Sequence, residues 1–175
     1  MKQTMTFFAH AACVLLIQPA TGHAQAPASP ADSRPELLRQ LDGNWTMSGD
    51  VRGKPVTYRM VAAPALQGTF TELRMMDVQV PAQYEAAVFI GYDAAGKTVI
   101  AHWMDSFGAR YSIPHGAGQI AGDVIEFTIS YASGQFRNTW RFDAATSSWQ
   151  FALEAAQPDG SWKHFARYEV KRSQP

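Results

Sequence analysis

The chain has 175 residues, with 15 lysines and arginines, 15 aspartates and glutamates, and a single cysteine. This balanced charge excludes the basic excess that is typical of nucleic-acid-binding proteins. The 46% of apolar residues excludes a disordered chain, and one cysteine cannot form a disulfide framework. The 12% of aromatic residues is typical of a domain built from strands rather than from a helical bundle.

The N-terminus, residues 1–24, has the pattern of a secretory signal peptide. Lys2 supplies the positive charge, residues 7–17 form a short apolar run, and Gly22-His23-Ala24 is a small-residue cleavage site. The run is too short to cross a bilayer, which requires about 20 apolar residues. We therefore predict an exported protein, periplasmic or secreted, with no integral membrane segment after cleavage and no cysteine in its mature form.

A leader and a short helix are predicted next. Residues 25–34 are rich in proline, alanine and serine, a composition that predicts a disordered leader. The domain is predicted over residues 35–172. It begins with a helix at residues 35–41, in which Asp32 or Ser33 lies near the N-cap. Its apolar face consists of Leu37, Leu38 and Leu41.

After Gly43, apolar and polar residues alternate with a period of two, which is typical of half-buried antiparallel strands. In the last of these strands, Trp162, His164, Tyr168 and Val170 share one face. Turn signals that contain glycine, proline or aspartate separate about nine or ten strands. The predicted segments are residues 45–51, 56–60, 69–78, 84–92, 97–104, 108–114, 124–131, 136–142, 149–155 and 162–170.

So many short strands need either two packed sheets or one sheet that closes on itself. Short hairpin connections favour an up-and-down meander, and closure removes the exposed strand edges. We therefore predict an all-β fold, an antiparallel up-and-down barrel of about nine or ten strands with a short N-terminal helix. A two-sheet sandwich is the alternative.

Three motifs resemble those of an uncharacterised family of exported bacterial lipocalin-like (calycin) β-barrels. The first is a Gly-x-Trp element at Gly43-Asn44-Trp45, and the third is the aromatic and basic segment FARYEVKR at residues 165–172. The second is Ile90-Gly91-Tyr92-Asp93 followed by His102-Trp103-Met104-Asp105-Ser106. The resemblance covers residues 37–172. It implies a lipocalin-like barrel with an internal cavity, which in such proteins commonly holds a small apolar ligand.

The resemblance also implies that Trp45 lies at the closed end of the barrel, beneath a basic side chain of the last strand. Arg172 has the same strand parity as Tyr168, whereas Arg167 has the opposite parity. We therefore predict that Arg172 covers the Trp45 ring in a cation–π contact. A solvated Arg172 is the alternative.

Inward-facing aromatic side chains mark a candidate ligand site, because a barrel of this size has room for one small ligand. The candidate ligand-binding residues are Tyr58, Phe127, Tyr131, Asn138, Trp140, Phe151, His164 and Tyr168. The leading hypothesis is an exported binding protein for a small apolar molecule or lipid, with no nucleic-acid partner and no expected cofactor.

Catalytic and metal-binding patterns are sparse. The histidines of the mature chain, His102, His115 and His164, lack a spacing such as His-x-x-x-His, and no Gly-x-Ser-x-Gly element occurs. Asp105 is interpreted as a strand-ending residue that binds turn amides. Nitrobindin-like haem barrels, which are related calycins, carry an iron-ligating histidine near the C-terminal strand. A haem-binding or other cavity enzyme that uses His164 is therefore an alternative, and a non-catalytic interaction protein with a filled barrel is a third.

Overall fold

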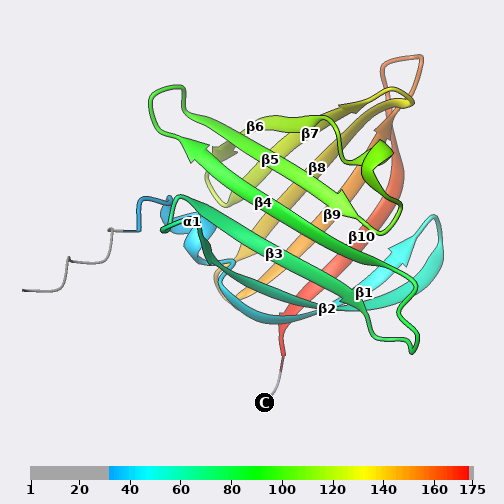
Figure 1. Ribbon diagram of the computed structural model, residues 1–175, viewed down its shortest axis with the longest axis horizontal. Helices are drawn as coiled ribbons and strands as arrows, with labels where there is room; N and C mark the ends of the chain where they lie inside the picture. The colour runs from blue at the N-terminus through cyan, green and yellow to red at the C-terminus, as the bar shows by residue number, and fades with distance from the viewer. Residues whose placement is uncertain (1–31, 174–175) are drawn as a thin grey trace, which may run out of the picture.

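The computed structural model describes residues 32–173, so the predicted signal peptide and residues 25–31 of the predicted leader lie outside the described residues. Ten strands form one closed antiparallel barrel in which sequence neighbours pair and β10 closes on β1 (Figure 1). The predicted all-β barrel is therefore confirmed. The strands are β1 (Gly43–Val51), β2 (Lys54–Ala65), β3 (Phe70–Asp77), β4 (Glu85–Asp93), β5 (Thr98–Asp105), β6 (His115–Ala121), β7 (Val124–Tyr131), β8 (Gly134–Asp143), β9 (Ser148–Ala156) and β10 (Trp162–Arg172).

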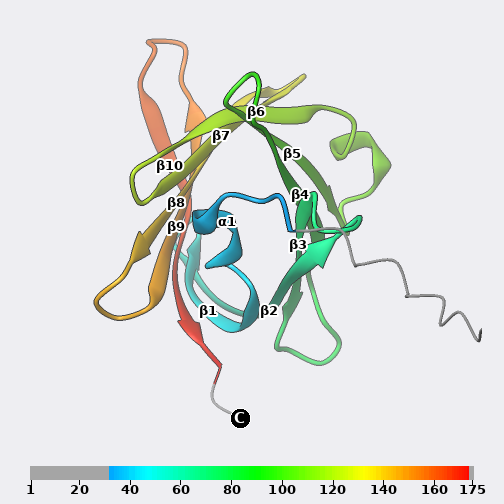
Figure 2. The same ribbon diagram turned by 90° about the vertical axis from the view of Figure 1, so that its left-hand side faces the viewer.

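The two ends of the barrel differ. The helix α1 (Glu36–Arg39) lies inside the ring of strands at one end, which we call the closed end (Figure 2). The turns at residues 66–69, 94–97, 122–123 and 144–147 lie at this end, because an up-and-down meander places alternate connections together. The opposite end, which we call the open end, has the connections at residues 52–53, 78–84, 106–114, 132–133 and 157–161. No helix of residues 32–173 is long and apolar enough to cross a membrane.

The helix α1 is shorter than predicted, and its N-terminus is formed differently. Pro35 occupies the N-cap position, and no side chain caps the helix. The expected caps, Asp32 and Ser33, have other partners, because the Asp32 carboxylate binds the Arg34 side chain and the Ser33 amide bonds to a carbonyl beyond β2. Leu38 is fully buried on the inner face of the helix.

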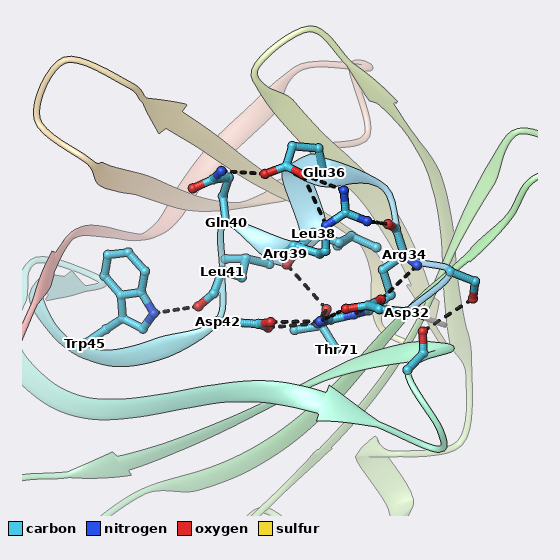
Figure 3. A network of polar contacts seen from close by, with 12 residues as sticks. Asp32, Arg34, Glu36, Leu38, Arg39, Gln40, Leu41, Asp42, Trp45 and Thr71 are labelled. Atoms are coloured by element: carbon cyan, nitrogen blue, oxygen red, sulfur yellow. Dashed lines mark hydrogen bonds and ion pairs between the residues drawn. The ribbon is translucent and has the colours of Figure 1, made fainter. Parts of the chain in front are cut away.

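Arg34, which the sequence places in the disordered leader, is instead a buried part of the fold (Figure 3). Its guanidinium group donates to both carboxylate oxygens of Asp32 and of Asp42 at 2.6–2.9 Å, and to the Thr71 hydroxyl at 2.7 Å. All five N–H groups of this side chain therefore have acceptors. Because Thr71 belongs to β3, the network fastens the segment before α1 to the barrel wall.

Large side chains fill the half of the barrel next to α1. Trp45, Trp140 and Trp149 are fully buried there. The Trp140 ring stacks on Phe151, with ring centroids 3.9 Å apart and an interplanar angle of 12°. Burial of apolar surface stabilises the fold by roughly 25 cal/mol per Å². Because this half is packed, the space inside the barrel lies toward the open end.

The Gly-x-Trp element joins the helix, the first strand and the last strand. The Trp45 indole N–H donates to the Leu41 carbonyl at 2.6 Å, and the Arg172 guanidinium carbon lies 3.9 Å from the centroid of the Trp45 ring. Arg172 also donates to the Asp42 carbonyl at 2.5 Å. Gly43 has a φ of +130°, and a Cβ there would lie only 1.9 Å from Arg172 Nη1. Arg172 is thus the basic residue over Trp45, and glycine at position 43 leaves room for it.

The sixth strand is not at the predicted position. The sequence predicts a strand over residues 108–114, but this segment is a loop with a short 3-10 helix, η1 (Ala109–Tyr111), and β6 begins at His115. Gly116 and Gly118 make β6 resemble a loop in the sequence. A Cβ on Gly118 would lie 1.8 Å from the Glu126 carbonyl oxygen, so the close approach of β6 to β7 requires glycine there.

A β-bulge changes the direction of side chains near the start of β10. The pairing of β10 with β9 shifts between His164 and Ala166. Ala166 and Tyr168 face the interior, whereas the His164 side chain is 43% exposed and its Nε2 lies 2.8 Å from Asp50 Oδ1. The predicted inward orientation of His164 is therefore wrong, because it assumes an unbroken alternation and a bulge adds one residue.

Candidate functional site

A cavity of about 940 Å³ occupies the open half of the barrel. Aromatic rings form much of its wall: Tyr58, Tyr84, Trp103, Phe107, Tyr111, Tyr131, Phe136, Phe151, Phe165 and Tyr168. The other lining residues are Val51, Arg52, Lys54, Val56, Met75, Gln83, Asp105, Ile129, Ser133, Asn138 and Leu153. They come from inward-facing strand positions and from the connections at the open end. The wall is therefore largely aromatic with a few polar side chains, and its two basic residues, Arg52 and Lys54, come from the first hairpin.

The structure brings some of the predicted ligand-binding residues together and separates others. Tyr58, Tyr131, Asn138, Phe151 and Tyr168 line the cavity. Phe127 and Trp140 are buried in the packed core and are not among the lining residues. His164 lies outside the cavity beside Asp50. On β10, the bulge directs Phe165 toward the cavity instead of His164.

Three tyrosines form a cluster on one side of the cavity. The Tyr58 ring lies between Tyr84 and Tyr168, with centroid distances of 5.5 Å and 5.7 Å. Burial raises the pKa of all three phenols, and the neighbouring charge of Asp77 also raises the pKa of Tyr58. These hydroxyl groups therefore keep their protons at neutral pH, and each can both donate and accept a hydrogen bond. The Tyr84 hydroxyl already lies 3.4 Å from Asp105 Oδ2 and accepts from the Trp103 indole nitrogen.

Trp103 and its polar contacts belong to the cavity wall, although Trp103 is not among the predicted ligand-binding residues. The Trp103 indole nitrogen lies 3.2 Å from Asp105 Oδ2 and 3.3 Å from the Tyr84 hydroxyl. The other oxygen of Asp105 accepts the Phe107 amide at 3.0 Å, which is the turn interaction that the sequence predicts for Asp105. A usable signal exists in the Trp-x-Asp spacing, because residues two apart on a strand share a face.

The charge of Asp105 reaches a second wall of the cavity. Burial and the negative charge of Asp105 together raise the pKa of Tyr131 to about 12. A carboxylate held among aromatic rings in this way is a polar group against which a bound molecule can be oriented.

Asn138 adds an acceptor at the inner wall. Its side chain is 1% exposed, and its amide nitrogen donates to the Phe136 carbonyl at 3.3 Å. Its Oδ1 has no hydrogen-bond partner among residues 32–173. An unpaired buried acceptor costs about 1–3 kcal/mol. Asn138 is therefore a second polar group that distinguishes this wall from a purely apolar one.

Basic side chains stand at the mouth of the cavity. The Arg52 guanidinium carbon lies 5.7 Å from the centroid of the Phe165 ring, and Lys54 follows it on β2. Within the described part of the chain, neither Arg52 nor Lys54 forms an ion pair. Among residues 32–173, no group of three or more histidine, cysteine, aspartate or glutamate side chains is arranged to hold a metal ion.

Fold and cavity together define the class: a closed ten-stranded antiparallel β-barrel with an aromatic-lined interior that opens at one end. Over residues 31–172 the chain matches, and therefore belongs to, the family described as "Protein of unknown function (DUF1579)". No curated protein matches it.

A similar solved structure is the crystal structure of Rv2717c from M. tuberculosis. The two chains are 14% identical, with a TM-score of 0.56, over 80% of this chain and 99% of that chain. At this identity the likeness supports the barrel fold alone.

Proposed function

We propose that this protein is an exported binding protein that holds one small apolar ligand in the cavity at the open end of its barrel. The observation that carries the proposal is the cavity itself, about 940 Å³ with a largely aromatic wall. Ligand sites in proteins commonly have volumes of roughly 300–1,000 Å³ and walls of this composition. Transfer of an apolar ligand from water to such a wall is favourable by roughly 25 cal/mol per Å² of buried surface.

The polar groups of the cavity orient the ligand. Asp105 and the Oδ1 atom of Asn138 are acceptors, while the phenol of Tyr168 can donate or accept. A ligand with an apolar body and a single hydroxyl or amine group matches this set, because it leaves few polar atoms of its own unpaired. Mostly apolar walls with a few polar groups are typical of specific small-molecule sites.

Export is the second part of the proposal, and it rests on the signal-peptide pattern of residues 1–24. Expression of the full chain in a Gram-negative host, followed by cell fractionation and intact-mass measurement, tests it. We expect a periplasmic or secreted protein whose N-terminus lies at Gln25 or within about two residues of it. An unprocessed chain in the cytoplasm would overturn this part alone.

The alternatives receive less support. A cavity enzyme that uses His164, with or without haem, is not favoured because His164 lies outside the cavity and contacts Asp50 at 2.8 Å. An interaction protein with a filled barrel is not favoured because only the half of the barrel next to α1 is filled.

Two measurements test ligand binding. Organic extraction of the purified protein, followed by mass spectrometry, should release an apolar molecule in stoichiometric amount. An apolar fluorescent dye should bind the emptied protein, and Leu153→Trp should weaken its binding by about tenfold or more because the larger ring fills the cavity. Ala152→Trp is the matched control, because Ala152 neighbours Leu153 on β9 and is not a lining residue.

The outcomes show whether the barrel contains a ligand site. Loss of dye binding in Leu153→Trp alone supports a ligand site inside the barrel. Absence of any extracted molecule together with absence of dye binding would overturn the proposal, as would equal effects of the two substitutions.

A further inference from the structure

Two neighbouring connections at the open end expose apolar side chains to solvent. They are residues 78–84 between β3 and β4, and residues 106–114 between β5 and β6, which we call the mouth loops. Val80 is 95% exposed, Ile113 is 80% exposed and Phe107 is 69% exposed. The loops lie side by side, because the Phe107 ring packs against the Tyr84 ring with centroids 5.6 Å apart.

The mouth loops are almost free of charge. Residues 78–84 read VQVPAQY, and residues 106–114 read SFGARYSIP, so Arg110 is their one charged residue. Arg110 forms no ion pair within residues 32–173, and its guanidinium carbon lies 5.8 Å from the Tyr111 ring centroid. The composition is therefore apolar and slightly basic.

The carboxylates next to the mouth loops have partners. Both oxygens of Asp77 accept amides of the loop that follows it, and Asp105 contacts the Trp103 indole and the Phe107 amide. Glu85 is the exposed exception. The exposed tips of the loops thus present valine, isoleucine, aromatic and arginine side chains, and of the described residues Glu85 is the one exposed carboxylate directly beside them.

This exposed apolar surface continues into the cavity. Phe107 and Tyr111 line the cavity and are also 69% and 48% exposed. Contiguous exposed apolar side chains mark interaction sites, because soluble proteins rarely leave them uncovered. Apolar tips, an aromatic residue and a basic residue together match the interface of an anionic lipid bilayer.

We propose that the mouth loops dock the open end of the barrel onto an anionic phospholipid surface. This inference rests on the proposed function, since docking in this orientation places the cavity entrance against lipid. An apolar ligand then passes between bilayer and cavity without crossing water. Val80 and Ile113 enter the interfacial region, and Arg110 contacts lipid phosphate.

Vesicle co-sedimentation tests the proposal with a chain that begins at Gln25. This chain contains every described residue and lacks the apolar run at residues 7–17, which would bind vesicles by itself. The vesicles contain phosphatidylcholine alone, or phosphatidylcholine and phosphatidylglycerol at about 3:1. We expect binding to the anionic vesicles and a loss of about tenfold or more in the double variant Val80→Ser/Ile113→Ser.

The matched control is Val61→Ser/Leu66→Ser, which removes two apolar side chains that are 50% and 64% exposed away from the mouth. It should bind vesicles like the unchanged protein. Arg110→Gln should weaken binding to the anionic vesicles and should leave binding to phosphatidylcholine alone unchanged. Val80, Ile113 and Arg110 do not line the cavity, so dye binding in solution should be the same in every variant.

Three results would overturn membrane docking. The first is the absence of vesicle binding, and the second is an equal loss of binding in the two double variants. The third is a dimer in sedimentation analysis that becomes a monomer in Val80→Ser/Ile113→Ser, because a second copy of the chain would then cover the loops. If dye binding persists in any of these cases, membrane docking fails and ligand binding by the cavity stands.

Discussion

Arg172, at the end of β10, lies over the ring of Trp45 in β1, with its guanidinium carbon 3.9 Å from the ring centroid. The same guanidinium donates to the Asp42 carbonyl, and the Trp45 indole donates to the Leu41 carbonyl. One pair of side chains thus joins the last strand, the first strand and the turn after α1. This contact holds the barrel closed at the end where its core is packed.

Removal of this contact should lower stability modestly. We expect Arg172→Ala to reduce the free energy of unfolding by about 1 kcal/mol, the usual size of a cation–π contact at a partly exposed site. Urea denaturation monitored by tryptophan fluorescence measures the change. Arg167→Ala is the control and should change stability by less than about 0.5 kcal/mol. Equal losses in the two variants would contradict the assigned role of Arg172.

The Arg34 network should contribute more to the free energy of unfolding than the contact between Arg172 and Trp45 does. Arg34→Ala leaves Asp32 and Asp42 without their shared partner and leaves the Thr71 hydroxyl without its donor. Because the two carboxylates keep about a third of their exposure, we expect a loss of about 2–3 kcal/mol rather than the full cost of a buried charge. Thermal unfolding measures it. Arg141→Ala, in the exposed pair with Asp123, should cost less than about 1 kcal/mol.

The same network predicts that the stability of the fold depends on pH in the acidic range. Hydrogen bonds from Arg34 lower the pKa of Asp32 from 3.8 to about 2. A lowered pKa in the folded state means that the stabilisation is present above about pH 4 and is lost as the pH falls toward 2. The melting temperature should therefore decrease between these values. In Asp32→Asn the decrease should be smaller, and an unchanged profile would argue against the Arg34–Asp32 contact.

The cavity tyrosines predict a loss of stability at alkaline pH. The pKa of Tyr131 is raised to about 12 by burial and by Asp105, and burial also raises the pKa of Tyr84. A raised pKa in the folded state gives stabilisation below about pH 10 that is lost as the pH rises through the folded value. Asp105→Asn should lower the pKa of Tyr131, and absorbance titration of tyrosinate in variants with and without Tyr131→Phe measures the shift.

Much of the barrel is predictable because it depends on local alternation. On β10, the alternation after the bulge places Tyr168 and Val170 inside and Arg172 over Trp45. On β5, the same rule places Trp103 and Asp105 on one face. Period-two patterns report which side chains share a face, and this information is contained in a few consecutive residues.

The segment of residues 106–121 shows the limit of this reasoning. Ala109, Tyr111 and Ile113 alternate like a strand, yet they lie in a mouth loop and all three are exposed. The true strand, β6, contains Gly116 and Gly118, which read as a turn signal. Glycine is needed here because β6 lies close to β7, and a Cβ on Gly118 would collide with the Glu126 carbonyl. No local sequence pattern reveals this contact.

Local alternation is sufficient for the fold class and for several cavity residues, because hydrophobic burial and strand parity act over short stretches. The pairing of Trp45 with Arg172 comes from the family resemblance, and strand parity selects Arg172 rather than Arg167. The position of His164, the burial of Arg34 and the contacts among Tyr84, Trp103 and Asp105 depend on segments that meet only in the folded barrel. Neither a bulge of one residue nor a contact between segments distant in the sequence leaves a periodic trace. These features arise from packing between segments that are distant in the sequence.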